Sequence, residues 1–395
     1  MNIEHAPLFE SLLMRDVRLK NRIAFAPTDM GTADRDGRVT DQMLCHYVAR
    51  AKGGAGMIIV EHTMSNYLYG LEGSGLLGAH NDRCLSGMAD IASAVRTFNA
   101  VSIVQLSIGL GRFGMKAVGP SPVPYRIPPG STHRGFKRLE GRTGPVPREL
   151  STDEIENLEN LFVSAVRRIK RAKFKGIEIH GAHGYLLSSF LSPLTNHRTD
   201  RYGGSFENRL RLAINLIQRS REVAGDKFII GFRVSGDEHV EGGMTLDEVV
   251  EAAPILERAG IDYIHLSSGT IEAWKHTFPA KDGSMLAEAE AIKQVVSIPV
   301  ICPSFHDPDA AARAVGEGKV DLVSMSRALI ADPQWPNKVS AGHASDIQKC
   351  TRSNYCLQTL LQGFQARCCV NPNVGRERFV PDYFPPPRKG GGRAI

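Results

Sequence analysis

The sequence lacks the features that would assign it to a membrane, to secretion or to nucleic acid. No stretch reaches the roughly 20 apolar residues that a membrane-spanning helix needs. The first residues, MNIEHAPLFE, show no basic region followed by an apolar core, so we expect no secretory signal. The net charge of +6 is modest for 395 residues, and the basic residues are scattered among acidic ones. This pattern favours a solvated surface over a nucleic-acid interface.

Cysteine is sparse until the end of the chain. Seven cysteines in 395 residues, without a secretory signal, predict a reducing compartment, the cytoplasm, rather than a disulfide framework. Four of them crowd together near the C-terminus, and these are Cys350, Cys356, Cys368 and Cys369. That segment therefore requires an explanation of its own.

Short, continuous apolar runs recur along the chain, each bounded by Gly, Pro or Asn. Hydrophobicity without alternation is expected of parallel strands that are buried on both faces. Eight strands are predicted on this basis, at Arg22–Pro27, Gly56–Glu61, Ser102–Leu106, Gly176–Gly181, Phe228–Val234, Tyr263–Ser268, Ile298–Pro303 and Leu322–Arg327.

Amphipathic helical patterns separate most of these runs. Glu154–Lys170 is preceded by Ser151, which has the spacing of a capping box with Glu154. Asp247–Ala259 opens in the same way, with Thr245 and Glu248. Because no Gly-x-Gly-x-x-Gly follows the first strand, the alternation favours an α/β fold of the (β/α)8 TIM-barrel type over a doubly wound sheet.

Two long polar segments follow strands. Gly109–Leu150 leaves the third strand and is rich in Gly, Pro and Arg, and Ser192–Asn208 leaves the fourth. We expect the first to be a functional lid or a disordered excursion. The barrel pattern stops near Lys338, so we predict a barrel over residues 1–340, a cysteine-containing extension over 341–379 and a Pro/Gly-rich linker or tail over 380–395.

The sharpest local motif is His180-Gly-Ala-His183-Gly-Tyr185, at the end of the fourth strand. Imidazoles can donate hydrogen bonds to a substrate oxygen, and a phenol can deliver a proton as a general acid. The alternative is a pair of satisfied histidines at a strand–loop junction. Three polar rings on the face where barrel active sites assemble favour a catalytic role for His180, His183 and Tyr185.

The next segment carries a resemblance to a known family. Asn196-x-Arg198-x-Asp200-x-Tyr202-Gly-Gly-Ser205, with Asn208-Arg209-x-Arg211, resembles the signature of old yellow enzyme-type flavoproteins. It is most similar to the long-chain branch that contains 2,4-dienoyl-CoA reductase and trimethylamine dehydrogenase, and the likeness extends over roughly Leu8–Gly375. From the residues themselves we interpret this segment as scaffolding, in which Arg, Asp and Asn form a buried lattice that holds a loop.

The resemblance implies that FMN is bound at the carboxyl ends of the strands. Pro27 and Thr28 are then expected against the flavin ring, and Gln105 on its pyrimidine side. Arg233 is expected to face N1 and O2, where negative charge appears on reduction. For Arg233 the alternative is a buried salt bridge to Glu or Asp.

The phosphate is expected between the last two strand ends. The backbone N–H groups of Ser304 and Phe305 are the candidates after the seventh strand, and Ser326 and Arg327 are those after the eighth. Family members usually carry glycines in both loops. Serine at 304 and 326 keeps a backbone donor and adds a hydroxyl.

The cysteine segment departs from the pattern of the resembled branch, which holds a [4Fe–4S] cluster with Cys-x2-Cys-x3-Cys-x11-Cys. Cys356 and Cys368 keep the last interval, but Ser353 stands three residues after Cys350 and the spacing to Cys356 is shortened. Two interpretations stay open. One is a degenerate cluster site on Cys350, Cys356 and Cys368, and the other is a remnant that holds buried free thiols.

The leading functional hypothesis is an FMN oxidoreductase that reduces activated C=C bonds of a small-molecule substrate with electrons from NAD(P)H. A second is oxidative N-demethylation of a small tertiary amine, which an aromatic wall at Trp274 would favour. A third is a non-catalytic FMN-binding subunit. The resembled branch continues into a dinucleotide-binding domain, so we expect either a trimmed chain or a separate flavin/NADH-binding partner. We also expect a homo-oligomer.

Overall fold

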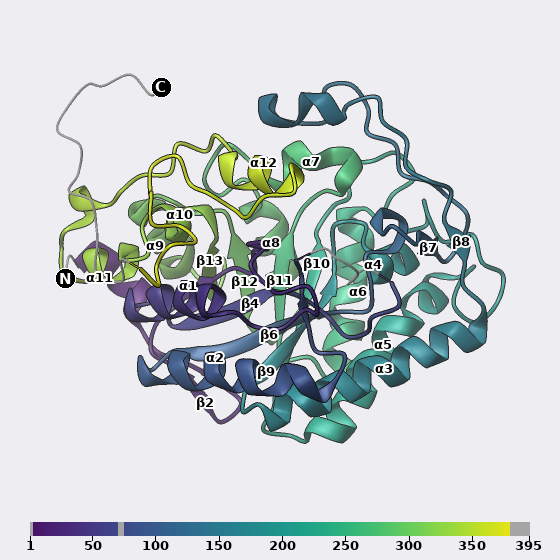
Figure 1. Ribbon diagram of the computed structural model, residues 1–395, viewed down its shortest axis with the longest axis horizontal. Coiled ribbons are helices and arrows are strands. Elements are labelled where there is room, and N and C mark those ends of the chain that lie inside the picture. The colour runs from purple at the N-terminus through teal and green to yellow at the C-terminus, as the bar shows by residue number, and fades with distance from the viewer. Residues whose placement is uncertain (1–2, 70–74, 380–395) are drawn as a thin grey trace.

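The centre of the molecule is a closed barrel of eight parallel strands (Figure 1). The computed structural model describes residues 3–69 and 75–379. Neighbouring strands follow the order β3-β13-β12-β11-β10-β9-β6-β4, and a β3–β4 pairing closes the ring. The (β/α)8 prediction is confirmed. The eight strands are β3 (Ile23–Phe25), β4 (Met57–Met64), β6 (Val101–Ser107), β9 (Gly176–Gly181), β10 (Ile229–Ser235), β11 (Tyr263–Ser267), β12 (Val300–Pro303) and β13 (Leu322–Met325).

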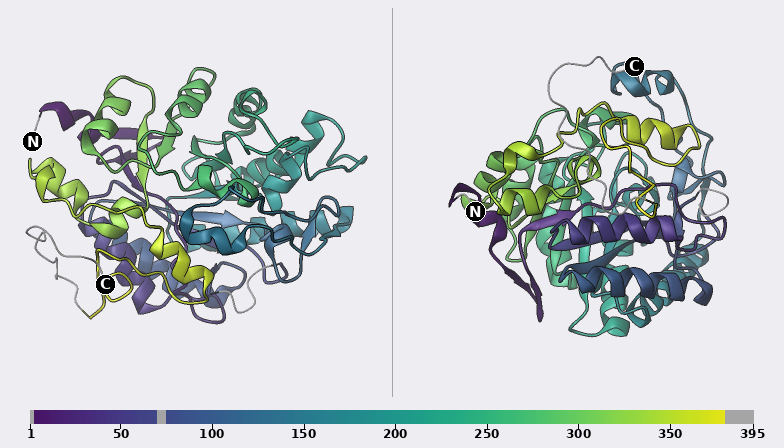
Figure 2. Two further views of the ribbon diagram at one scale, coloured as in Figure 1. Left: turned by 90° about the horizontal axis from the view of Figure 1, so that it is seen from above. Right: turned by 60° about the vertical axis from the view of Figure 1, so that its left-hand side comes forward.

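Helices surround the strands, as the view from above in Figure 2 shows. Both predicted capping boxes are present, at Ser151 before α3 and at Thr245 before α6. The α-helices are α1 (Asp41–Lys52), α2 (Leu85–Thr97), α3 (Thr152–Arg171), α4 (Leu186–Leu191), α5 (Phe206–Ala224), α6 (Leu246–Ala259), α7 (Trp274–Thr277), α8 (Leu286–Lys293), α9 (Pro308–Gly316), α10 (Arg327–Ala331), α11 (Trp335–Ser340) and α12 (Tyr355–Leu361). Short 3-10 helices are η1 (Ile3–Phe9), η2 (Asp82–Cys84), η3 (Gly111–Phe113), η4 (Arg134–Leu139), η5 (Ile271–Ala273) and η6 (Ala344–Asp346).

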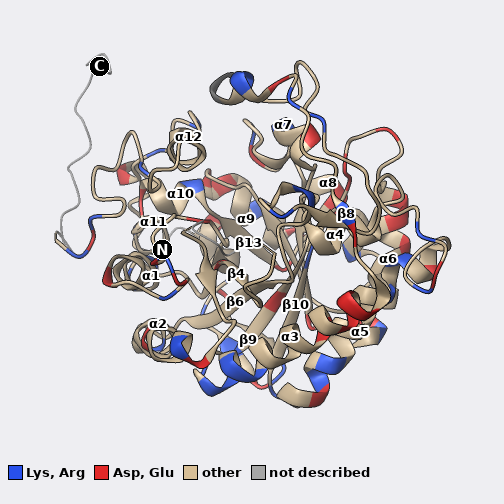
Figure 3. Ribbon diagram, turned by 45° about the vertical axis from the view of Figure 1, so that its right-hand side comes forward, with Lys and Arg blue, Asp and Glu red and all other residues tan. Residues whose placement is uncertain are grey.

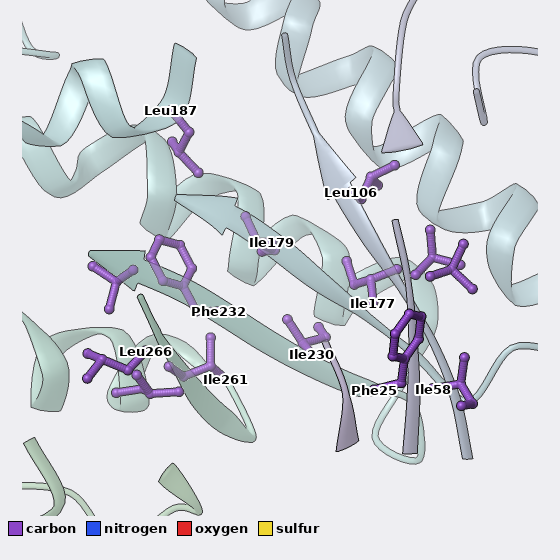
Figure 4. Close-up of a cluster of buried hydrophobic side chains, with 14 of the residues drawn as sticks. Phe25, Ile58, Leu106, Ile177, Ile179, Leu187, Ile230, Phe232, Ile261 and Leu266 are labelled. Carbon is purple, nitrogen blue, oxygen red and sulfur yellow. The ribbon is translucent and has the colours of Figure 1, made fainter. Parts of the chain in front are cut away.

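The alternation of side chains along each strand divides the interior into two cores. One set, which includes Ile177, Ile179, Ile230 and Phe232, packs with helix residues such as Leu187 (Figure 4). The other set fills the inside of the barrel. Its apolar layer includes Met57, Ile59, Ile103, Ile229, Tyr263, Ile301 and Leu322. Since every second residue faces the same side, the next inward positions are polar: Gln105, Glu178, Arg233, His265 and Ser324.

A hairpin that the sequence analysis did not anticipate closes the amino end of the barrel. β1 (Leu12–Met14) and β2 (Val17–Leu19) pair antiparallel. Met14 and Leu19 join the apolar layer inside the barrel. Arg15 in the turn bonds to Asp262 over 2.5 Å and fastens the hairpin to the barrel. The opposite, carboxyl end stays open for a site.

The segment Gly109–Leu150 is an ordered wall rather than an excursion. It contains η3, η4 and a short parallel pair of β7 (Val118–Gly119) with β8 (Arg148–Glu149). Arg198 holds β7 and β8 together, because its guanidinium donates to the carbonyl oxygens of Pro120 (3.2 Å) and Leu150 (2.6 Å), which directly follow these strands. The same side chain pairs with Asp200. The predicted scaffolding role of the signature segment agrees with these contacts.

The residues after α11 return across the carboxyl end of the barrel. In Figure 1 α12 (yellow) lies in the upper part of the view, and it contacts η4. Glu377 pairs with Arg50 of α1 over 2.7 Å, and Asn371 bonds to the carbonyl of Ile330 over 2.8 Å. The predicted division at residue 340 stays a prediction, and the predicted linker at 380–395 lies outside the described residues. The short strand β5 (Leu77–Gly78) extends the sheet beside β4.

Charged residues of both signs are intermingled on the outer helices (Figure 3). Over the described residues, no helix combines the length and the apolarity that crossing a bilayer requires.

Arg198 offers a test of how the wall is held. We expect Arg198→Met to lower the free energy of unfolding by about 3 kcal/mol, because two buried carbonyl oxygens and Asp200 lose their donor. The control is Arg201→Met, since Arg201 is half exposed in its pair with Glu156 and should change stability by less than about 1 kcal/mol. Urea unfolding measures both. Equal stability of the two variants would contradict this role for Arg198.

Candidate functional site

A cavity of about 530 Å³ opens at the carboxyl ends of the strands. This is the face on which barrel active sites assemble, and the volume is typical of a cofactor or ligand pocket. The cavity brings together the residues that the sequence analysis proposed for cofactor, catalysis and substrate, which are Pro27, Thr28, Gln105, His180, His183, Tyr185, Arg233, Trp274, Ser304, Phe305, Ser326 and Arg327. Their individual roles stay predictions.

A buried carboxylate forms the floor below this cavity. Glu178 of β9 is fully buried and accepts hydrogen bonds from Gln105 Nε2 (2.7 Å), Tyr263 Oη (3.1 Å) and His265 Nδ1 (2.8 Å). Burial opposes the charge on Glu178, but His265, Arg233 and Gln105 together hold its pKa below the usual range. The glycine at 231 is required here, because a Cβ would lie 2.0 Å from Cζ of Tyr263.

Arg233 projects from β10 into the same region. It is 8% exposed, and its Nε has no partner in the part of the chain that the structure describes. Burial lowers the pKa of Arg233, whereas the charge of Glu178 opposes that shift. The alternative of a salt bridge to Glu or Asp is not found among the described ion pairs, although Glu178 supplies a nearby countercharge. A buried donor without a partner indicates that a ligand can complete its hydrogen bonding.

His180 and His183 form a directed chain of hydrogen bonds. The Ala182 N–H donates to His180 Nδ1 (3.3 Å), so His180 carries its proton on Nε2 and donates to His183 Nδ1 (3.3 Å). His183 Nε2 then donates to the hydroxyl of Ser267 (2.6 Å). Burial, with neighbouring positive groups, lowers the pKa of both imidazoles well below the usual range, so both are neutral. In this arrangement their N–H groups are engaged with protein.

The loop conformation at His183 is unusual. Its φ of +66° lies in the left-handed region, which non-glycine residues seldom adopt. Its backbone N–H donates to the Ser235 hydroxyl over 3.2 Å. Such conformations cluster at functional sites, where the surroundings hold them in place.

The sequence analysis missed a third histidine in the cavity. The ring of His62 lies 4.9 Å from that of His180 and 4.8 Å from that of Tyr185. His62 is 3% exposed, and neither of its ring nitrogens has a partner within residues 3–69 and 75–379. Burial lowers its pKa to about 4, so the ring is neutral and keeps one free donor and one free acceptor.

The position of His62 follows from an irregularity in β4. The pairing of β4 with β6 shifts register between Val60 and Thr63, as in a β-bulge. Bulges redirect side chains and are frequent beside active sites. The predicted strand ended at Glu61, three residues before β4 ends at Met64. The sequence did contain a signal for His62, namely a histidine directly after a predicted strand end.

In the loops expected to hold a phosphate, some of the hydrogen-bonding groups are already bonded within the protein. Ser304 has a φ of +71°, which agrees with glycine being usual there, but its N–H donates to the Ser324 carbonyl (3.2 Å). Arg327 donates to Asn354 Oδ1 (2.7 Å) and to the Pro279 carbonyl (2.9 Å). The Ser326 hydroxyl accepts a bond from the Thr28 hydroxyl (2.7 Å), which joins the first and last strand ends.

Aromatic rings form the outer wall. Trp274 of α7 packs against Phe136 of the Gly109–Leu150 segment, with 5.1 Å between ring centroids. Phe113, Tyr125 and Phe278 also line the cavity. Segments from opposite sides of the barrel thus meet over its mouth.

The C-terminal cysteines lie close to this cavity, and Cys356 contributes to its lining. Burial, with the neighbouring thiols of Cys350 and Cys368, raises the pKa of Cys356 to about 12. Cys369 is exposed and contacts the Thr351 hydroxyl. Across residues 3–69 and 75–379, no group of three or more His, Cys, Asp or Glu residues is placed to hold a metal ion. The [4Fe–4S] site on Cys350, Cys356 and Cys368 stays a prediction.

Comparison with known proteins identifies the family. The sequence model of the NADH:flavin oxidoreductase / NADH oxidase family matches residues 7–346. The chain belongs to this family. It is 38% identical to an NADH oxidase of Thermoanaerobacter brockii over 410 residues, which cover 99% of the chain and 60% of that protein. It is 31% identical to a cinnamate reductase of Clostridium sporogenes over 96% of the chain and 59% of that protein.

A solved structure shows the same architecture. The complex of 2-naphthoyl-CoA reductase with 2-naphthoyl-CoA matches with a TM-score of 0.85 and 30% identity, over 94% of this chain and 58% of the other. The chain thus spans about three fifths of these curated relatives. Members of this family use a flavin and a nicotinamide donor, and the residues of the cavity fit a flavin. The buried Arg233 lacks a partner on Nε, and the cavity is large enough to hold the ring.

The thiols provide a test that needs no cofactor. At about pH 8 the raised pKa keeps Cys356 in its thiol form, and only the thiolate is nucleophilic. We therefore expect iodoacetamide to alkylate Cys369 at least about tenfold faster than Cys356, as read by peptide mass spectrometry. Cys369→Ser should remove this fast reaction, whereas Cys356→Ser should leave it intact. Equal alkylation rates would contradict the buried environment of Cys356.

Proposed function

We propose that the chain binds FMN and reduces activated C=C bonds of enone or enoyl substrates with electrons from NAD(P)H. Family membership supports the flavin and the nicotinamide donor. The named activities of the similar cinnamate reductase and 2-naphthoyl-CoA reductase support an unsaturated substrate. The observation that carries the proposal is the meeting of Arg233, Tyr185 and three histidines on one cavity.

The ring is proposed to lie over the polar layer of the barrel. Arg233 would face its N1 and O2 edge, and its positive charge would favour the reduced, anionic ring. Gln105 is held in place by Glu178 and would contact the pyrimidine side. Pro27 and Thr28 would form the adjoining edge. When bound, the flavin supplies the hydride.

The phosphate is proposed to lie between β12 and β13. The Ser304 N–H is engaged with Ser324, so the Ser304 hydroxyl and the Phe305 N–H are the candidate donors of that loop. Ser326 contributes a hydroxyl from the neighbouring loop. Arg327 is held by Asn354 and Pro279, and its charge attracts the phosphate from a fixed position.

Tyr185 is proposed to protonate the α-carbon. Burial, together with the charge of Asp29, raises the pKa of Tyr185 above its ordinary value, so the phenol is protonated at neutral pH. His180 and His183 form the wall that orients the substrate carbonyl. Because their N–H groups are engaged with each other and with Ser267, the free N–H of His62 is the better donor to that oxygen.

The second candidate is oxidation of a small tertiary amine on the same barrel. The aromatic wall of Trp274, Phe136 and Phe278 favours it, because aromatic faces attract cations. A third outcome, a non-catalytic FMN-binding subunit, predicts flavin binding without turnover.

The cellular location and the partners of the chain are also part of the proposal. All seven cysteines are free thiols, which supports a reducing, cytoplasmic location. A homo-oligomer and a separate flavin/NADH-binding partner stay predictions.

One experiment distinguishes these candidates. The FMN-loaded protein is reduced anaerobically by NADPH or NADH and then mixed with 2-cyclohexenone, and flavin re-oxidation is followed by absorbance. A parallel sample of oxidised protein receives trimethylamine. We expect the enone to re-oxidise the flavin and the amine to leave it oxidised. Flavin reduction by the amine would favour the second candidate, and no response in either arm would favour the third.

The role of Tyr185 gives a sharper prediction. We expect Tyr185→Phe to slow re-oxidation by the enone about 100-fold or more, because the α-carbon loses its proton donor. Reduction by NAD(P)H should change little. The matched control is Tyr125→Phe, which alters another phenol of the cavity. Equal re-oxidation rates in the two variants would contradict the assignment.

A further inference from the structure

Two carboxyl groups near the proposed proton donor are not used by the mechanism above. Asp29 follows β3 and lines the cavity, and Glu61 lies in β4, fully buried. The segments that carry them run side by side, because β3 pairs with β4. The His62 N–H lies near the Asp29 carboxyl, and the Met30 N–H lies near the Glu61 carboxyl. The two side chains are therefore fixed next to each other.

Each carboxyl group is only half satisfied. Glu61 Oε2 accepts a bond from the Tyr47 hydroxyl (3.0 Å), but Glu61 Oε1 and Asp29 Oδ1 are both buried and have no partner among the described residues. An ionised carboxylate without donors is costly in such a place, and two adjacent ones cannot both stay charged. A proton on the pair removes most of that cost, because it neutralises one group and provides a donor for the other.

We propose that Asp29 and Glu61 hold a proton beside the cavity, and that Asp29 returns this proton to Tyr185 after each turnover. This inference rests on the proposed function, in which the Tyr185 phenol gives its proton to the α-carbon. The Asp29 O–H bond then breaks, the phenolate oxygen of Tyr185 takes up the proton, and Asp29 is left ionised. Asp29 regains a proton from Glu61 or from water in the cavity. No electrons are moved in this step.

The electrostatics of the pair agree with this role. Burial raises the pKa of Asp29 to about 7, against the effect of its backbone hydrogen bond. Burial, and then the charge of Asp29, raises the pKa of Glu61 well above its usual range. The titratable groups that face Asp29 are Glu61 and His62 from β4, and Tyr185 from the start of α4, while Tyr47 of α1 faces Glu61.

The side chains described next, which lie around Asp29, are uncharged and supply no positive countercharge. His62 is uncharged, since its pKa is about 4. The C-terminal segment brings an apolar side chain to Gly31, two residues after Asp29, where a Cβ would lie 2.9 Å from Leu360 Cδ2, and Leu360 and Asp29 line the same cavity. Burial without a nearby cation thus favours the protonated form of Asp29 over a wider pH range than that of an ordinary carboxyl group.

Turnover kinetics test the return step. FMN-loaded Asp29→Asn is compared with the wild type in a single re-oxidation by 2-cyclohexenone and in steady-state turnover with NAD(P)H. Tyr185 begins each single re-oxidation protonated, so we expect that rate to be unchanged, whereas the steady-state kcat should fall about tenfold or more. Added formate should restore part of the kcat that Asp29→Asn loses. Asp237→Asn, a carboxyl group on another loop and outside the cavity lining, should leave both rates unchanged.

The pH profile adds a second readout. The wild-type kcat should fall as the pH rises through about 7, because Asp29 loses its proton, and this limb should be absent in Asp29→Asn. Glu61→Gln keeps Asp29, so the limb should persist in this variant. Wild-type rates for Asp29→Asn in both assays, or equal losses in both, would overturn the proposal.

Thermal unfolding reports the held proton without any turnover. A folded-state pKa raised from about 4 to about 7 means that the wild type loses stability as the pH rises between these values. The Tm of Asp29→Asn relative to the wild type should therefore increase from about pH 5 to about pH 8. A Tm difference between the two proteins that stays constant with pH would overturn the claim that the pair holds a proton. A protein that never reduces the enone overturns the proposed function and the return step, whereas the Tm series still decides whether the pair is protonated.

Discussion

A single buried carboxylate connects the strands on which the site is built. Glu178 of β9 binds donors from β6 and from two positions of β11, and its charge balances that of Arg233 on β10. Because the group is fully buried, each donor must stay in place or leave a costly unsatisfied charge. The positions of Gln105, His265 and Arg233 are therefore fixed together. The cavity above this layer therefore has a rigid floor.

The floor also separates two electrostatic environments within one cavity. On the barrel axis, Arg233 provides a permanent positive charge with unsatisfied hydrogen-bonding capacity. Along the β4 and β9 side, burial keeps His62, His180, His183 and Tyr185 uncharged. A positive charge suits a cofactor that becomes negative on reduction, and neutral donors suit a substrate carbonyl and a proton transfer. The two kinds of chemistry are thus assigned to different strands.

Much of this arrangement follows from local features of the sequence. The eight apolar runs, the capping boxes before α3 and α6, and the rule that strand ends meet at one face bring Gln105, His180, Arg233 and Ser326 to one cavity. These features depend on nearby residues and on the two-residue period of a strand, so a single sequence contains them.

Other features depend on contacts between distant segments and could not be predicted in this way. The bulge in β4 that positions His62 reflects its pairing with β6. The Ser304 N–H is occupied by Ser324, and Arg327 is held by Asn354 from the C-terminal segment. The β1–β2 hairpin becomes stable only because the barrel end accepts Met14 and Leu19. A strand-end rule alone places a side chain near the site but does not say which of its donors remain free.

The central claim is that the strand ends meet around one flavin. The most direct measurement is the uptake of FMN by the purified protein, followed by gel filtration and a visible absorption spectrum. The account predicts about one FMN per chain, with an affinity that falls about tenfold or more in Arg233→Met because a charged hydrogen-bond donor is lost. A colourless protein that does not retain FMN, or one whose affinity is the same in Arg233→Met, would contradict it.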